Sequence, residues 1–294
     1  MRLGVHLVNF DYAGGPATIG PTLARVGAAA EAGGIANLSV MDHYFQLEGF
    51  AAAEGPMLEG YTTLGYLAGV TSTVELQILV TGVTYRYPGL LAKIVSTLDV
   101  LSGGRAVLGL GAAWYEREHH ALGVPYPPTR ERLELLEETL QVVTQMWSND
   151  NGPYAGAHFR LAETINSPQP LRRPPIMIGG SGEKRLLRLV ARYADASNMF
   201  AGPQIGPAAV AHKYDILAAH CAHEGTNPDR IAKTVLWIAP VVPDAAGGAA
   251  FVEQMRAYAA IGVEQVHVMP LTGDPVAFVQ GLGAHVVGGL DELG

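Results

Sequence analysis

Short apolar runs that alternate with segments of helical periodicity restrict the fold of this chain more than any other feature. Eight runs, most of them rich in Val, Ile and Leu, lie at residues 3–9, 37–41, 76–80, 105–110, 175–178, 194–199, 234–241 and 264–269. Helical periodicity marks the segments 18–33, 60–71, 89–101, 182–193, 207–224, 247–261 and 275–286. Continuous apolar strands between helices indicate a parallel sheet that helices cover. Eight strand–helix units in 294 residues predict a (β/α)8 TIM barrel, with a doubly wound open sheet as the alternative.

One segment departs from this alternation. Residues 129–148 are predicted to form an amphipathic helix, because their apolar side chains recur every three or four residues. These side chains are Leu133, Leu136, Leu140, Val143 and Trp147. A long stretch rich in Gly and Pro follows, and such stretches in compact domains are usually functional or disordered. We expect residues 122–174 to form an insertion between the fourth and fifth strands that packs over one barrel end, within a single domain, 1–294.

Composition excludes several classes of partner. The formal net charge is −8 and no basic stretch emerges, which argues against nucleic acid or a membrane surface as partner. The single cysteine, Cys221, rules out an internal disulfide framework and suits a reducing compartment. The N-terminal residues lack the anatomy of a signal peptide, and no apolar stretch approaches the length of a membrane span. We therefore expect a cytoplasmic protein.

In barrels of this kind the catalytic residues gather at the C-terminal ends of the strands. The fifth run ends in a glycine-rich turn before a helix, made of Gly179, Gly180, Ser181 and Gly182. Backbone N–H groups of glycines approach an anion closely, and a helix N-terminus adds a favourable dipole. The turn therefore predicts a phosphate site, with Ser181 as a helix cap; an ordinary turn with a serine cap is the alternative. Neither the P-loop spacing nor G-x-G-x-x-G is present.

The helix after this turn carries several basic residues. Arg185, Arg188 and Arg192 share one helix face, and we interpret them as a solvated basic stripe. Lys184 and Arg185 either serve an anionic ligand or face solvent.

Asp42 and His43 directly follow the second run, at a strand end. A histidine there is a candidate for proton transfer, and the adjacent aspartate can orient it. We expect no metal site, because no convincing set of partner ligands accompanies the histidines. The pairs His119–His120 and His220/His223 have no evident ligand partners.

Two further strand ends are of interest. After the third run, Thr81-Gly82-Val83 suggests a bulge or a sharp turn, and Tyr85 and Arg86 face a ligand or brace the loop. After the fourth run, small residues precede Trp114 and Tyr115, and we expect Trp114 to pack in the core. No covalent nucleophile is evident, so the reaction is expected to depend on a cofactor.

Three segments together resemble the bacterial luciferase-like monooxygenase superfamily: 37–46 (NLSVMDHYFQ), 80–128 (from VTGVTYRYPG to GVPYPP) and 174–198 (PPIMIGGSGEKRLLRLVARYADASN). The similarity extends to about residue 200 and is greatest to the branch that uses the deazaflavin coenzyme F420.

The resemblance implies a TIM barrel, often dimeric, that binds a flavin-type ring at its C-terminal mouth. It implies a non-proline cis bulge behind the ring, which falls on Gly82–Val83, and a proton-transfer role for His43. The cofactor-binding residues it implies are His43, Thr81, Gly82, Val83, Ala112, Tyr115, Gly179, Gly180, Ser181, Gly182, Asn198 and Phe200.

The chain departs from the deazaflavin-dependent glucose-6-phosphate dehydrogenases of this superfamily at two positions. Those enzymes have a glutamate where this chain has Ala112 and a lysine where it has Pro203. These differences argue against sugar-phosphate oxidation by their scheme.

We therefore predict an oxidoreductase that transfers a hydride between coenzyme F420 and a small organic substrate, as a homodimer, with His43 and Asp42 as catalytic residues. One alternative is an FMN-dependent monooxygenase that activates O2 at the flavin. Another is a flavin- or deazaflavin-binding protein without turnover.

Overall fold

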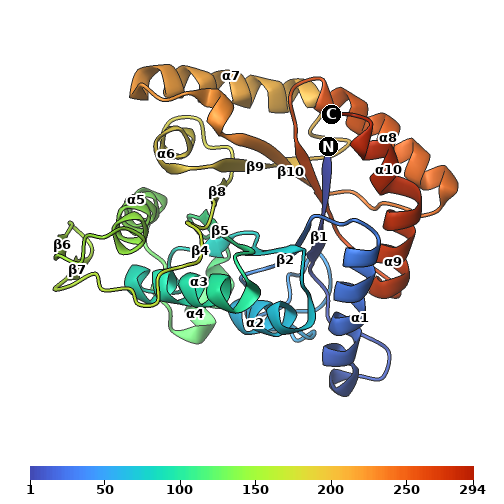
Figure 1. Ribbon diagram of the computed structural model, residues 1–294, viewed down its shortest axis with the longest axis horizontal. Helices are drawn as coiled ribbons and strands as arrows, with labels where there is room; N and C mark the ends of the chain where they lie inside the picture. The colour runs from blue at the N-terminus through green and yellow to red at the C-terminus, as the bar shows by residue number, and fades with distance from the viewer.

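A computed structural model describes residues 1–294. Eight parallel strands close into a barrel in the order β3-β2-β1-β11-β10-β9-β8-β5, and the pairing of β3 with β5 completes the circle (Figure 1). The strands are β1 (Arg2–Leu7), β2 (Asn37–Val40), β3 (Glu75–Ile78), β5 (Ala106–Gly111), β8 (Ile176–Gly179), β9 (Ala196–Ala201), β10 (Ala232–Trp237) and β11 (Gln265–Val268). The short strand β4 (Thr81–Gly82) also pairs with β5. The predicted TIM barrel is confirmed, and the open sheet is excluded.

Helices surround the barrel (Figure 1). They are α1 (Ile19–Ala32), α2 (Gly60–Val70), α3 (Pro88–Ser102), α5 (Thr129–Met146), α6 (Leu186–Tyr193), α7 (Pro207–Glu224), α8 (Ala245–Ala259) and α9 (Pro275–Leu282). Local sequence explains many of the ends. For example, α7 begins at a proline in its first turn and ends before Gly225, whose φ of 70° suits glycine. None of the helices is both long and apolar enough to cross a bilayer.

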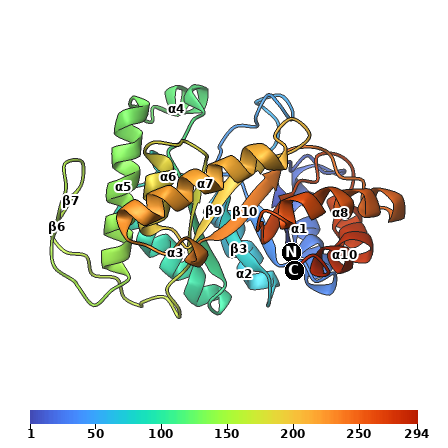
Figure 2. The ribbon, with the colours of Figure 1, turned by 90° about the horizontal axis from the view of Figure 1, so that it is seen from above.

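The segment between β5 and β8 differs from the expected insertion. Helix α5 contacts α3 and α6, so it belongs to the ring of helices and does not cover a barrel end (Figure 2). The physical reason is its apolar stripe, since Leu136, Leu140 and Val143 are fully buried in the main core. The short helix α4 (Glu116–Leu122) precedes it, and a hairpin of β6 (Tyr154–Ala155) and β7 (Arg160–Leu161) follows it.

The inside of the barrel holds an apolar cluster and buried polar side chains. The apolar cluster takes one residue from or next to each barrel strand: Val8, Met41, Leu79, Val107, Met177, Ala196, Leu236 and Met269. Polar pairs are buried as well. Nδ1 of His6 lies 2.9 Å from Oγ of Ser39, and the Asn198 amide donates to Oγ1 of Thr234 at 2.8 Å. Such pairing limits the cost of burying polar groups.

Two buried histidines should make the barrel sensitive to acid. Burial lowers the pKa of both His6 and His267 to about 3, whereas an unfolded histidine titrates near 6.5. Between about pH 3 and pH 6.5 the unfolded chain binds more protons than the folded chain. The free energy of unfolding therefore has its full value above the unfolded pKa and decreases as the pH falls below it. We expect each histidine to lower the free energy of unfolding by about 1 kcal/mol per pH unit below pH 6. Urea unfolding at several pH values measures this, and His6→Gln should reduce the slope; an unchanged slope would contradict the assignment.

Candidate active site

A cis peptide bond between Leu79 and Val80 follows the end of β3 at the mouth of the barrel. Three glycines leave room for the Val80 side chain. A Cβ atom placed on Gly111 would lie 2.7 Å from Val80, and one on Gly179 would lie 2.9 Å from it. A Cβ on Gly109 would also crowd Val80 and would collide with the carbonyl oxygen of Ile78. Glycines on neighbouring strands β5 and β8 therefore accommodate the bulge.

The expected position of this bulge, Gly82–Val83, is wrong. β3 ends at Ile78, two residues before the end of the predicted run, so the cis bond lies three residues earlier. Gly82 instead lies in β4 and pairs with Gly111 of β5. Val83 is buried in the main core. Thr81 is fully buried, and its Oγ1 lies 2.7 Å from the hydroxyl of Tyr61.

Gly109→Ala tests the close packing behind the bulge. The added methyl group meets backbone, which cannot move cheaply, so we expect a loss of about 2 kcal/mol in the free energy of unfolding. Gly65→Ala in α2 is the control, because a Cβ there meets nothing within 4 Å and alanine favours the helix. Chemical denaturation of both variants measures the difference, and equal stabilities would refute the close packing.

His43 lies at the mouth and contacts helix α4. Its Nδ1 is 3.3 Å from Oε1 of Glu118, and its imidazole packs edge-on against the rings of Trp114 and Tyr115, each with centroids 5.5 Å away. The imidazole is 12% exposed, whereas the Glu118 side chain is completely buried. The polar partner of His43 is therefore Glu118.

Asp42 does not orient His43, in contrast to the expectation from its sequence position. Its carboxylate accepts hydrogen bonds from Nη1 of Arg86 at 2.9 and 2.8 Å and from the N–H of Gly82 at 2.8 Å. The physical reason is that a buried carboxylate needs hydrogen-bond donors, and Arg86 and the N–H of Gly82 provide them on the side of the loop after β3. Arg86 also pairs with Glu59 at 2.6 Å and lies over the Tyr61 ring. Arg86 thus braces the loop.

Helix α4 and the loop after β2 meet at the same end of the molecule (Figure 2). The hydroxyl of Tyr115 donates to Glu48 at 2.6 Å, and Arg117 pairs with the same carboxylate. Trp114 was expected in the core, but it is 61% exposed. It lies in the turn between β5 and α4, beyond the reach of the barrel core, and its ring walls the mouth beside His43.

The glycine-rich turn after β8 is exposed, and Gly180 has a φ of +120°, a conformation that favours glycine. The N–H of Gly180 donates to the carbonyl of Asn198 at 2.9 Å, whereas the N–H groups of Ser181 and Gly182 have no backbone acceptor. Helix α6 starts only at Leu186, with no side-chain cap. The expected capping role of Ser181 is therefore wrong, because a turn separates it from the helix.

The arginines of α6 form ion pairs at the surface. Arg188 pairs with Glu224 at 2.6 Å and Arg192 with Glu137 at 2.6 Å. Arg185 lies 3.4 Å from Glu134. The stripe therefore joins α6 to its neighbours α5 and α7.

The remaining candidate residues lie around the mouth and the barrel wall. The carbonyl of Ala112 accepts a hydrogen bond from Nε of Arg132 at 2.9 Å. Asn198 points into the barrel toward Thr234, and Phe200 at the end of β9 is exposed. No group of three or more His, Cys, Asp or Glu side chains is arranged to hold a metal ion. Cys221 is buried and free.

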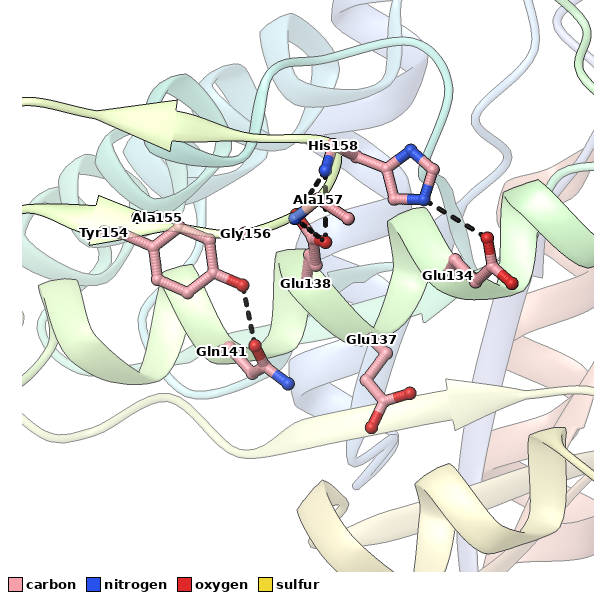
Figure 3. Close-up of a pocket in the computed structure, with 9 residues that line it drawn as sticks. All are labelled: Glu134, Glu137, Glu138, Gln141, Tyr154, Ala155, Gly156, Ala157 and His158. Carbon is pink, nitrogen blue, oxygen red and sulfur yellow. Dashed lines mark hydrogen bonds and ion pairs between the residues drawn. The ribbon is translucent and has the colours of Figure 1, made fainter.

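A surface pocket lies away from the mouth, between α5 and the β6–β7 hairpin (Figure 3). Its lining residues are Glu134, Glu137, Glu138, Gln141, Tyr154, Ala155, Gly156, Ala157 and His158. The carboxylate of Glu138 accepts the N–H groups of residues 157, 158 and 159, and Glu134 lies 3.3 Å from His158. These carboxylates are engaged in holding the hairpin on the helix.

Sequence reasoning missed two residues of the mouth. Val80 lies in the apolar run 76–80, which predicts a strand, and the available signal was a set of glycines on two neighbouring strands, Gly109 and Gly111 on β5 and Gly179 on β8, which leave space for a side chain. Glu118 was overlooked because no local pattern links it to His43, 75 residues earlier.

Comparison with known proteins extends these observations. The family model of luciferase-like monooxygenases matches residues 1–270. An F420-dependent glucose-6-phosphate dehydrogenase of Microbacterium testaceum is 30% identical over 190 residues, 64% of this chain and 55% of that protein. The pyrimidine monooxygenase RutA of Stutzerimonas stutzeri is 30% identical over 174 residues, 58% of this chain and 47% of that protein. The chain thus spans about half the length of the curated relatives it matches.

Two solved structures share the fold. An F420-dependent secondary alcohol dehydrogenase, in complex with an F420-acetone adduct, has a TM-score of 0.82 at 16% identity and covers 98% of both chains. A coenzyme F420-dependent tetrahydromethanopterin reductase from Methanopyrus kandleri has a TM-score of 0.79 at 17% identity, also over 98% of both chains. At these identities the likeness concerns the fold alone.

Proposed function

Because this chain belongs to the luciferase-like monooxygenase family, we propose that it is an oxidoreductase that transfers a hydride between coenzyme F420 and a small organic molecule. The observation that carries the proposal is the imidazole of His43 at the barrel mouth, paired with a buried carboxylate and walled by aromatic rings. F420-dependent enzymes among the sequence relatives and the solved structures support this choice of coenzyme.

The residues at the mouth fit a flavin-type coenzyme. The turn at Gly179–Gly182 offers N–H groups without backbone acceptors, as a phosphate group requires. Gly111 and Gly179 lack side chains where the Val80 side chain packs, so the Val80 bulge lies close against β5 and β8, where we propose that it supports a flat ring. When bound, the deazaflavin ring supplies the carbon that accepts or donates the hydride.

The chain's own residues would provide binding, orientation and proton transfer. Val80 would support the ring, and the N–H groups of Ser181 and Gly182 would bind the phosphate. His43 exchanges with the substrate the proton that accompanies the hydride. Asp42 and Arg86 fix the loop after β3, so the bulge keeps its position behind the ring.

The substrate is proposed to be something other than a sugar phosphate. At the end of β5, Ala112 contributes only a methyl group, and its carbonyl oxygen is already engaged by Arg132. Pro203, after β9, carries no charge for a phosphate. A homodimer, which the resemblance implies, and a cytoplasmic location, which the composition indicates, also remain predictions.

The second candidate is an FMN-dependent monooxygenase, which the similarity to RutA favours. Equilibrium binding of purified protein to coenzyme F420 and to FMN separates the two. We expect tight binding of F420 and weak binding of FMN; tight binding of FMN alone would overturn the proposal. A second assay tests the alternative of a binding protein without turnover. Alcohols are added with the oxidised coenzyme, and ketones with the reduced coenzyme, while the coenzyme absorbance is followed. A change in the wild type that is absent in His43→Ala excludes this alternative.

A further inference from the structure

We propose that Glu118 is a positioning residue that holds His43 in the tautomer with hydrogen on Nδ1, so that Nε2 is free to exchange a proton with a ligand at the mouth. This role rests on the proposed function, in which His43 is the proton-transfer group. Neither the adjacent Asp42 nor any other carboxylate contacts the imidazole.

The carboxylate of Glu118 is surrounded by hydrogen-bond donors. Its Oε2 accepts the N–H groups of Tyr44 at 2.5 Å and Phe45 at 2.7 Å. Its Oε1 accepts the hydroxyl of Tyr85 and lies 3.3 Å from Nδ1 of His43. Burial by itself raises the pKa of Glu118, but these hydrogen bonds outweigh burial and hold the pKa below its ordinary value. Glu118 is therefore an ionised carboxylate.

An ionised carboxylate has no hydrogen to donate, so the hydrogen between Glu118 and His43 belongs to the imidazole. A neutral His43 consequently carries hydrogen on Nδ1 and has a lone pair on Nε2. Nε2 can therefore accept a proton from a ligand at the mouth while Nδ1 keeps its hydrogen bond to Glu118. This arrangement suits removal of a proton from a hydroxyl-bearing substrate.

The surroundings fix the ring as well as its hydrogen. The N–H groups that Glu118 accepts belong to Tyr44 and Phe45, the two residues directly after His43. The rings of Trp114 and Tyr115 confine the imidazole edge-on. The Glu118 carboxylate thus fixes three properties of His43: the position of the main chain after it, the orientation of its ring and its tautomer.

A purely structural brace would explain the backbone contacts but makes a different prediction. If Glu118 only stabilised the loop, Glu118→Gln would lower the free energy of unfolding and leave the tautomer of His43 unchanged. Tyr85→Phe is the matched control, because it removes another donor to the same oxygen and leaves the contact with His43. The Phe ring retains the stacking of Tyr85 on His119.

Nitrogen NMR of the imidazole in the coenzyme-free protein, with His43→Gln for assignment, provides the test. We expect hydrogen on Nδ1 in the wild type and in Tyr85→Phe. In Glu118→Gln the ratio of the Nδ1–H to the Nε2–H form should fall about tenfold or more, as for the loss of a hydrogen bond to a charged group. An unchanged ratio in Glu118→Gln, or an equal fall in Tyr85→Phe, overturns the proposal.

The wild type alone decides the question if Glu118→Gln does not fold, because hydrogen on Nε2 of His43 would contradict the assignment directly. Binding assays keep this proposal apart from the proposed function. Absence of F420 and FMN binding in the wild type would refute the function, whereas the NMR result concerns Glu118 and His43 only. With coenzyme bound, Glu118→Gln should lower kcat about tenfold or more and leave KM nearly unchanged.

Discussion

Arg86→Met is expected to lower the free energy of unfolding by about 3 to 5 kcal/mol. Arg86 and Asp42 form a buried ion pair at 2.8 Å, with side chains only 10% and 2% exposed. Methionine fills much of the same volume but leaves the Asp42 carboxylate buried without its partner, with only the Gly82 N–H as a donor. The cost comes from this uncompensated charge and exceeds the net value of the pair itself.

Arg117→Met is the matched control. Arg117 also pairs with a carboxylate, that of Glu48, but both side chains are about half exposed. Exposed pairs contribute about 1 kcal/mol or less, so this variant should remain close to the wild type. Denaturant unfolding of the two variants measures the contrast, and similar losses would contradict the burial argument.

The pH dependence of Arg86→Met should be distinctive. Burial raises the pKa of the Asp42 carboxyl, although Arg86 opposes the rise. Without the arginine the pKa of Asp42 rises further, so in the variant Asp42 takes up a proton at a higher pH than in the wild type. The difference in the free energy of unfolding between the variant and the wild type therefore becomes smaller as the pH falls. Asp42→Asn in the Arg86→Met background should restore part of the lost stability at neutral pH. A deficit that stays constant with pH would show that the lost charge pair is not its cause.

His43→Gln is expected to lower turnover about 10³-fold while coenzyme affinity stays within a few-fold of the wild type. Glutamine keeps a polar side chain at the mouth but cannot exchange a proton near neutral pH. The rings of Trp114 and Tyr115 still confine the position, so the mouth should keep its shape. Coenzyme absorbance under single-turnover conditions, with an organic substrate that supports wild-type turnover, measures the loss.

His120→Gln is the control for His43→Gln. His120 is an exposed histidine on α4 that lies 3.8 Å from Glu116 and has no contact with His43. We expect its turnover to equal that of the wild type. If His43→Gln retains full turnover, proton transfer by His43 is refuted; if it loses coenzyme binding in proportion, His43 is a binding residue instead.

Much of the fold could be read from the sequence, because strands and helices are local. The alternation of apolar runs with helical periodicity located all eight barrel strands within a few residues and most of the helices. The amphipathic helix predicted at 129–148 is present, but it lies in the ring of helices and not over a barrel end as expected. Local periodicity records that a helix buries one face, whereas the partner of that face depends on how the chain closes.

Part of the candidate site was also visible in the sequence. His43 and the turn Gly179–Gly182 follow strands, and closure of the barrel brings such ends to one mouth. The bulge was misplaced because a strand end cannot be read to the residue from composition. Its position is set instead by the space that Gly109, Gly111 and Gly179 leave for Val80.

The sequence by itself therefore determined the alternation of strands and helices and the strand ends that carry His43 and the glycine-rich turn, whereas only the pairing of β3 with β5 excluded an open sheet and established the closed barrel. Only the tertiary structure decided the partners. Asp42, next to His43 in the chain, pairs with Arg86 from another loop, while Glu118, 75 residues away, takes its place beside the imidazole. The physical reason is that hydrogen bonds and charge pairs form between groups that closure of the barrel brings within about 3 Å, and neighbourhood along the chain does not report that distance.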